Sequence, residues 1–210
     1  MASTATPYGF RPLRHEAGMP AGGAMPTEEF RIKANYSGVI PYGAPVRMSL
    51  TNDPSSSFGA GYIVNVSGAS MIQSSVPDYY VGIFVGCQYT NPTNGQPQWD
   101  QWYPGSVNAT DITAYVVTDP GAALQVQASA ASFDAYAAVG TSFPIIIPGT
   151  PYNAGSKNST ISLDTSGSAA STAPFKVMGI AQTPDNANAT GYVDVIVKVQ
   201  QAFHIYTRAL

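Results

Sequence analysis

The chain has 210 residues, a charged fraction of 10% and a formal net charge of −3 at neutral pH. This length allows one large β domain or two small ones with a real hydrophobic core, and the slight negative charge gives no electrostatic reason to bind nucleic acid. The single cysteine, Cys87, excludes an internal disulfide and any zinc site built on two or more thiolates. Few charges beside 20 glycines and 17 prolines favour short strands, long loops and surface that another molecule covers.

Residues 1–29 are predicted to form an extended N-terminal arm, because their prolines and glycines interrupt both helical and strand periodicity. The arm has no apolar segment typical of a secretory signal, and no segment of the chain is long and apolar enough to predict a membrane helix. Aromatic and cationic side chains near its tip suit it to gripping a neighbour, although a floppy terminus is the alternative. These side chains are Tyr8, Phe10, Arg11 and Arg14. We expect a chain lacking residues 1–14 to keep its β core.

Residues 30–210 are predicted to form a single β-rich domain, because apolar and polar residues alternate in short runs separated by turn residues. The clearest run places Val193, Val195, Val197 and Val199 on one buried face. Strands are expected within residues 30–36, 44–50, 61–67, 79–86, 111–117, 123–129, 175–182 and 191–200. The fold class is therefore all-β, a barrel or sandwich of short antiparallel strands with at most one or two short helices.

Two other segments interrupt this pattern. Residues 129–140 are the best helix candidate, with Phe133, Tyr136 and Val139 on one face and Gly140 as a stop. A long polar loop is expected near residues 148–173, which are rich in Gly, Ser, Asn and Thr.

The segment from Val81 to Gly105 contains the only cysteine and both tryptophans. It is predicted to be a core strand with a buried, inert Cys87, then a Pro/Asn/Gly turn, then an aromatic return strand. Trp99 and Trp102 are expected to anchor packing or a protein interface, and one of the two can equally be a core residue.

The sequence contains few residues in patterns typical of a catalytic site. The only histidines are His15 and His204, so a nucleophile with a histidine base has few ways to assemble. The aspartates of the middle region stand mostly in turns, and no metal-binding or phosphate-binding spacing occurs. We therefore predict no enzymatic activity, no catalytic or metal site and no cofactor.

Several stretches carry a resemblance to a known class of proteins. They are "PYGFRPLRHEAG" near the start, "VGIFVGCQYTNPTNGQPQWDQWYPG", "ATDITAYVVTDPGAALQVQ", and "MGIAQTPDNANA" with "VDVIVKVQQAFH" near the end. Together they resemble virion structural proteins of tailed bacteriophages, above all the small proteins that decorate or cement the capsid.

The resemblance implies a β-rich protein made in the bacterial host cytoplasm and added to the outer surface of the assembled capsid. The partners that it implies are the major capsid protein and further copies of the chain, with which it forms a homotrimer. No membrane or nucleic-acid partner is expected. The interface anchors that we expect are Tyr8, Phe10, Arg11, Arg14, Trp99, Trp102 and Tyr103. The alternatives are a carbohydrate- or receptor-binding β module of a phage tail, using Trp99 and Trp102 as a platform, and a coat subunit.

Overall fold

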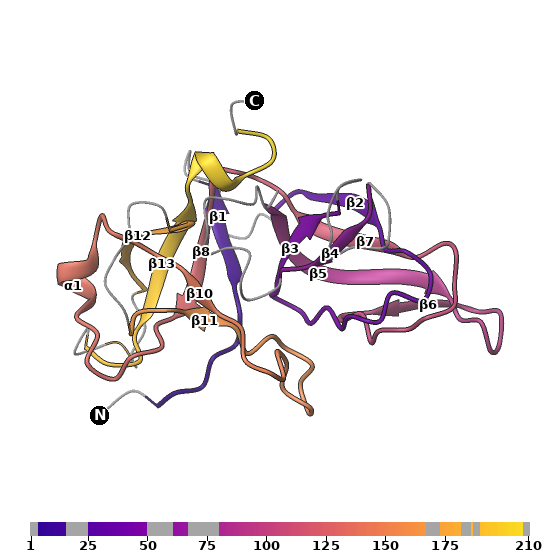
Figure 1. Ribbon diagram of the computed structural model, residues 1–210, viewed down its shortest axis with the longest axis horizontal. Coiled ribbons are helices and arrows are strands. Elements are labelled where there is room, and N and C mark those ends of the chain that lie inside the picture. Colours follow the sequence, from indigo (N-terminus) through magenta and orange to yellow (C-terminus); the bar gives the residue numbers. More distant parts are fainter. Residues whose placement is uncertain are drawn as a thin grey trace.

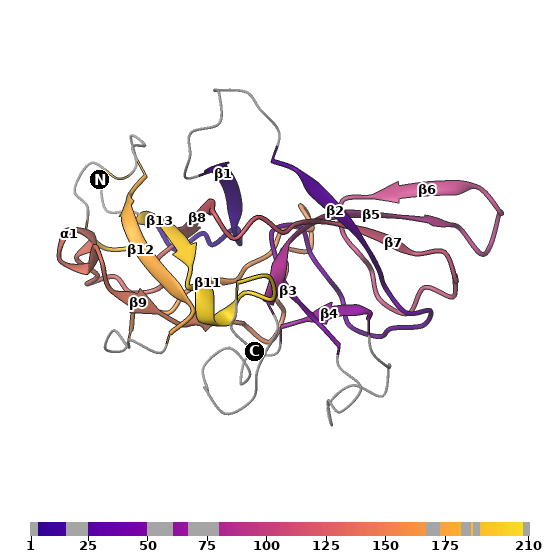
Figure 2. The same cartoon turned by 90° about the horizontal axis from the view of Figure 1, so that it is seen from above.

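The computed structural model describes residues 4–15, 25–49, 61–66, 80–166, 173–181, 186 and 190–207. Their secondary structure is almost entirely antiparallel β sheet, which confirms the predicted all-β class. Two main sheets lie next to each other along the long axis of an elongated molecule (Figure 1). The same division is visible from above (Figure 2).

The first sheet has five strands and contains the C-terminal strand predicted most clearly from the sequence. Its four alternating valines are all buried, as expected. The strand order is β1 (Arg11–His15), β8 (Ala122–Gln127), β13 (Asp194–Val199), β12 (Phe175–Ile180) and β9 (Ser142–Phe143).

The second sheet is built around one long strand, β5 (Tyr80–Thr90). It consists of β2 (Thr27–Arg31), β7 (Thr113–Val117), β5, β3 (Pro45–Met48) and β4 (Ile63–Asn65), while β6 (Pro97–Asp100) pairs with the C-terminal half of β5. The predicted strand over residues 30–36 is therefore placed wrongly, because β2 ends at Arg31 and the chain then turns. Ile32 and Tyr36 are nevertheless buried. The alternation of apolar residues therefore predicted their burial correctly, but it did not predict the backbone conformation.

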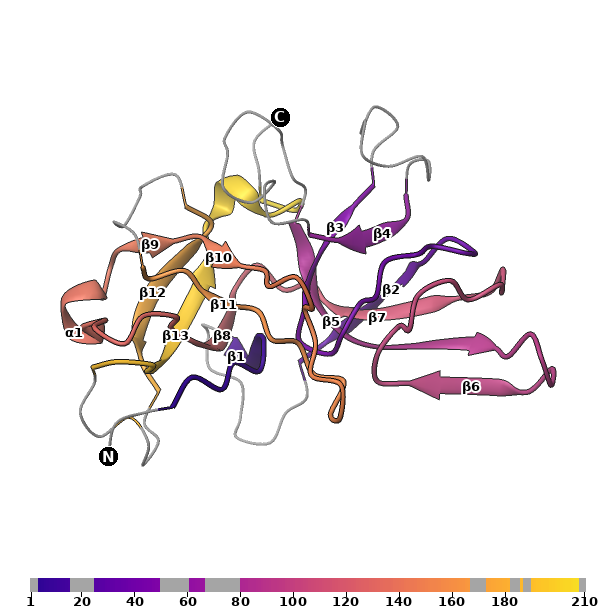
Figure 3. The ribbon, with the colours of Figure 1, turned by 60° about the horizontal axis from the view of Figure 1, so that its bottom comes forward.

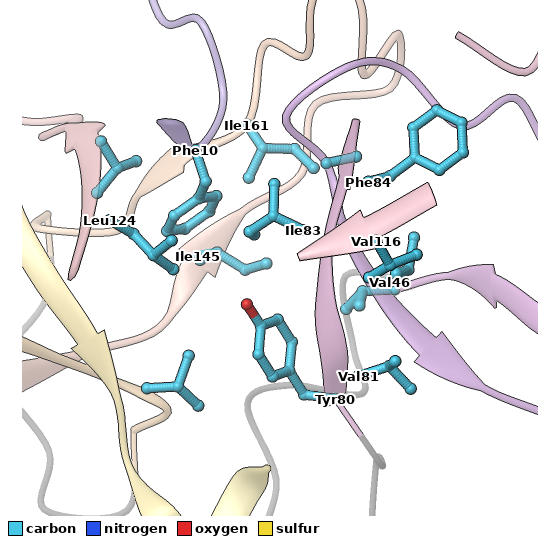
Figure 4. Packing of buried hydrophobic residues seen from close by; sticks show 14 of the residues in the cluster. Phe10, Val46, Tyr80, Val81, Ile83, Phe84, Val116, Leu124, Ile145 and Ile161 are labelled. Atoms are coloured by element: carbon cyan, nitrogen blue, oxygen red, sulfur yellow. The ribbon is translucent and has the colours of Figure 1, made fainter. Parts of the chain in front are cut away.

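One hydrophobic cluster joins the two sheets. Figure 4 shows Phe10, Leu124, Ile145 and Ile161 on the side of the first sheet, facing Ile83 and Tyr80 of β5. Other side chains, among them Phe84 and Val116, lie on the opposite side of β5. Each such side chain contributes about 1.5–3 kcal/mol when fully removed from water, so β5 is the strand on which the packing of the whole molecule depends.

The predicted N-terminal arm does not stand apart from the body in the part that the structure describes. Residues Arg11–His15 pair with β8 as an edge strand, and the ring of Phe10 stacks on that of Phe175 at 4.6 Å between centroids. Gly9 adopts φ +78°, and a Cβ there would lie 2.5 Å from the Cβ of Ser159. Because this segment supplies a core aromatic ring, we now expect loss of residues 1–14 to destabilise the β core, contrary to the expectation from the sequence.

The predicted helix is present but short. It spans α1 (Ala135–Ala138), and the Asp134 side chain accepts hydrogen bonds from the backbone N–H groups of Tyr136 and Ala137 as an N-cap. Its buried residues are Ala135 and Ala138. The predicted apolar face is correct only for Phe133, since Tyr136 and Val139 are exposed.

The predicted polar loop near 148–173 is partly regular. Strand β11 (Ser162–Leu163) pairs with β10 (Ile145–Ile146), and the Asn153 side chain accepts hydrogen bonds from the N–H groups of Gly155 and Ser156. Residues 167–172 of this loop lie outside the described part of the chain.

Candidate functional site

Two of the expected interface anchors belong to the core. Phe10 and Tyr103 are both 0% exposed. The Tyr103 hydroxyl donates to the backbone oxygen of Tyr36 at 2.9 Å and accepts from the N–H of Val107 at 3.3 Å. Both side chains stabilise the chain itself, which corrects the expectation that they anchor a partner.

The cluster at the N-terminus also works mainly within the chain. The guanidinium of Arg11 lies 4.0 Å from the centre of the Tyr8 ring, a cation–π contact. Burial and the nearby Asp194 carboxylate raise the pKa of Tyr8. The preceding segment is fixed to β8, because Gln127 accepts from the N–H of Thr6 at 2.8 Å. The Arg14 side chain lies outside the described part of the structure.

The two tryptophans lie in different surroundings, and only one of them points outward. Trp102 is half-buried against the loop after β10, with its ring 5.7 Å from that of Tyr152 and 4.7 Å from Lys157 Nζ. Trp99, on β6, is 60% exposed. These contacts do not bring Trp99 and Trp102 together into the expected shared platform. Of the two rings, Trp99 is the one that faces solvent.

The Trp99 ring lies close to the backbone of the neighbouring strand β5. A Cβ built on Gly86 of the neighbouring strand would lie 2.9 Å from the indole Cζ2 of Trp99, so only glycine permits this close approach. The strand pair β5–β6 that carries it extends away from the first sheet (Figure 3). The β5–β6 pair therefore presents an exposed aromatic ring that lies against a glycine.

A polar hollow of about 320 Å³ lies on the same face of the second sheet. Residues directly opposite each other in paired strands point to the same face, and Trp99, Gln88, Thr113 and Arg31 form one such row across four strands. A second row passes through Gly86, Tyr115 and Glu29. The hollow is lined by Glu29, Gln88, Tyr89, Thr90, Pro97, Asp111, Thr113 and Tyr115. Trp99 is not part of this lining and adjoins it through Gln88, its register partner.

Hydrogen bonds hold the groups around the hollow in place. The Tyr115 hydroxyl donates to Gln88 Oε1 at 3.1 Å. Asp111 Oδ2 accepts from the hydroxyl of Thr90 at 2.6 Å and from its N–H at 3.0 Å. The Thr90 hydroxyl bond, with the Arg31 charge as a smaller cause, lowers the pKa of Asp111, so this carboxylate is charged at neutral pH. The site thus combines an amide, hydroxyl groups and carboxylates beside an exposed indole.

Three large apolar side chains are exposed on β12 and in or next to α1, two neighbouring elements at the opposite end of the molecule from β6 (Figure 1). Tyr136 is 73%, Val139 47% and Met178 49% exposed. The N–H of Gly140, directly after Val139, donates to the backbone oxygen of Val177, directly before Met178, at 2.8 Å. We call Tyr136, Val139 and Met178 the α1–β12 patch. The sequence predicted Tyr136 and Val139 on one helix face but did not link them with Met178.

Cys87 and His204 are both buried. Cys87 is 0% exposed, and burial, with the nearby Asp100 as a further cause, raises the pKa of its thiol to about 12. His204 is 1% exposed, and burial lowers its pKa. The His15 side chain lies outside the described part. Cys87 is therefore held as a neutral thiol, which is a poor nucleophile.

Comparison of the chain with protein-family models, with curated proteins and with solved structures finds no match. Among the residues that the structure describes, no group of three or more His, Cys, Asp or Glu side chains is placed to hold a metal ion. Within the same residues, no helix has the length and apolar character needed to cross a membrane.

Proposed function

We propose that the chain is a non-enzymatic structural protein of a tailed-phage virion, which binds the outside of the assembled capsid and stabilises it. Its partners are the major capsid protein and further copies of itself in a homotrimer. The proposal rests on the resemblance of the four stretches quoted above to capsid decoration proteins, and on the all-β body. The structural observation that best supports the proposal is the α1–β12 patch.

The α1–β12 patch has the composition of a protein contact. Exposed apolar side chains that gather on one surface mark interaction sites more often than scattered ones do, and tyrosine and methionine are enriched in interfaces. Lys176 is exposed two residues before Met178, and its register partner across the strands is Lys198. The patch therefore offers an apolar centre with positive charge beside it, which fits an acidic rim on the capsid surface.

Binding of this kind stabilises a shell by mass action. A protein that binds the assembled capsid but not its free subunits adds RT ln(1 + [L]/Kd), about 2.7 kcal/mol per site at a hundredfold excess over Kd. Because many equivalent sites act together, a modest affinity at each site stabilises the whole shell.

The proposal is tested by adding the purified chain to phage heads that lack it, then measuring the number of copies bound and the temperature at which the genome is released. We expect saturable binding and a higher release temperature. The double variant Tyr136→Ser, Met178→Ser should bind at least about tenfold more weakly, the loss expected when interface anchors are removed. Leu13→Ser is the matched control, since Leu13 is also an exposed apolar residue, at 42%, but belongs to β1.

Two outcomes contradict the proposal. If the chain does not bind heads, or binds without changing the release temperature, it is not a cement protein. If the purified chain assembles alone into closed shells, it is a coat subunit instead. Weaker binding of Trp99→Ala with unchanged binding of the double variant would assign attachment to the opposite end of the molecule.

A further inference from the structure

We infer that the hollow beside Trp99 is a binding site for an uncharged oligosaccharide. The site comprises the exposed indole of Trp99 and the polar groups that line the hollow on β2, β5 and β7. This inference goes beyond attachment to a capsid and does not depend on it, since it concerns the other end of the molecule.

The aromatic part of the site is exposed and lies against the backbone of Gly86. Trp99 lies against Gly86, which leaves its outer ring face to solvent at 60% exposure. A rigid indole face is a low-entropy platform for the C–H face of a sugar ring, because little conformational freedom is lost on binding. An apolar ring that stays in contact with water costs free energy, and a ligand that covers the ring recovers part of that cost.

The polar part of the site fits hydroxyl groups. Glu29 and Asp111 provide carboxylate acceptors, while Gln88 provides an amide whose oxygen already accepts from Tyr115. Neighbouring sugar hydroxyls donate to carboxylates and accept from amide N–H groups, so this mixture satisfies both roles. An apolar partner would leave these groups without hydrogen bonds, at a cost in binding free energy. The composition therefore favours a hydroxyl-rich ligand over an apolar protein surface.

The charge of the site selects among such ligands. Glu29 and Asp111 make the hollow acidic, and Arg31 stands at the end of the Trp99 row, where its Nη2 donates to the backbone oxygen of Thr110 at 2.9 Å. Like charges in close proximity repel, so sulfated or carboxylated sugars are disfavoured. The volume of about 320 Å³ lies near the small end of ordinary ligand sites, which suits one or two sugar units with the rest of the chain outside.

The site also lies far from the α1–β12 patch along the long axis (Figures 1 and 2). A chain attached through that patch would keep the Trp99 end in solvent, where a sugar could reach it.

The inference is tested with the full chain on neutral hexasaccharides of glucose, mannose and N-acetylglucosamine, with a heparin hexasaccharide as the acidic probe. We expect at least one neutral probe to bind, a shift in Trp99 fluorescence in a Trp102→Phe background, and no binding of heparin. Trp99→Ala should weaken binding roughly tenfold or more, as loss of an aromatic contact predicts. Trp99→Tyr should retain most of it, and Glu29→Gln and Gln88→Ala should each weaken it.

Tyr136→Ser is the matched control and should bind sugar like the unaltered chain. Circular dichroism melts of every variant separate loss of the site from loss of the fold. The inference is overturned if no neutral probe binds, or if binding is unchanged in Trp99→Ala. Sugar binding without capsid binding would leave this inference standing while the proposed function fails, and the reverse result would do the opposite.

Discussion

At the scale of single residues, His204 is buried and is held by contacts with both neighbouring tyrosines. Its ring lies edge-on to Tyr80 at 5.4 Å between centroids, and its Nδ1 accepts from the backbone N–H of Tyr206 at 3.2 Å. Tyr206 in turn donates its hydroxyl to Glu28 Oε2 at 2.6 Å. The C-terminal segment is thus fastened to β2 and β5 around a neutral imidazole.

This arrangement predicts that stability falls in mild acid. Burial lowers the pKa of His204, although the nearby carboxylates of Asp119 and Glu28 act in the opposite direction. The unfolded chain binds the proton near its ordinary pKa of about 6.5, so stability is complete above that pH and is lost as the pH falls from there toward the lower pKa of the folded state. The free energy of unfolding in urea should fall between about pH 7.5 and about pH 5, and this fall should be smaller in His204→Gln than in the unaltered chain.

His15→Gln is the control, since His15 is the only other histidine. An equal loss of stability in His204→Gln and in the unaltered chain would show that other groups, such as carboxylates, cause the acid sensitivity.

The Cys87 thiol should be unreactive in the folded chain. It is buried, and its pKa is raised to about 12, so at pH 8 very little thiolate is present. A chromogenic disulfide reagent should react slowly with the native chain and at least about a hundredfold faster in urea, where the pKa returns to about 8.5. Rapid stoichiometric reaction of the native chain would contradict the buried position.

At the scale of elements, the N-terminal segment is where sequence and structure differ most. Strand β1 was not predicted because the prolines and glycines in and around it interrupt the alternation of apolar and polar residues, and its pairing with β8 cannot be read from the local sequence. Strands with alternating valines were predictable because one buried face determines the pattern.

The candidate sites were predictable only in part, for a related reason. The sequence drew attention to Trp99 but could not place it on Gly86 or beside the hollow, since those neighbours come from other strands. The α1–β12 patch was missed because the sequence does not show that Met178, about forty residues further along the chain, lies on a strand next to the helix. The helix is only four residues long, and its core contacts are made by two alanines.

The segment containing β1 should be essential to stability. Phe10→Ala removes a ring that is 0% exposed and stacked on Phe175, and such core truncations cost about 3–5 kcal/mol. Chemical unfolding should show this loss, and Leu13→Ala, three residues further along on β1, should change the unfolding free energy by about 0.5 kcal/mol or less, as for other exposed positions. A small effect of Phe10→Ala would restore the picture of a detached arm.

At the scale of the whole molecule, the two sheets share one core and leave different surfaces at the two ends. One end is the apolar α1–β12 patch with Lys176 beside it, and the other is Trp99 beside a polar, acidic hollow. In our account the first end attaches to a protein shell and the second remains in solvent.

The most direct test of this account is hydroxyl-radical footprinting of the chain free in solution and bound to phage heads, read out by mass spectrometry. Tyrosine, methionine and tryptophan side chains react readily with this probe, so Tyr136, Met178 and Trp99 report the two ends in one experiment. We predict strong protection of Tyr136 and Met178 on heads and unchanged oxidation of Trp99. Protection of Trp99 with Tyr136 and Met178 still fully reactive would contradict the account.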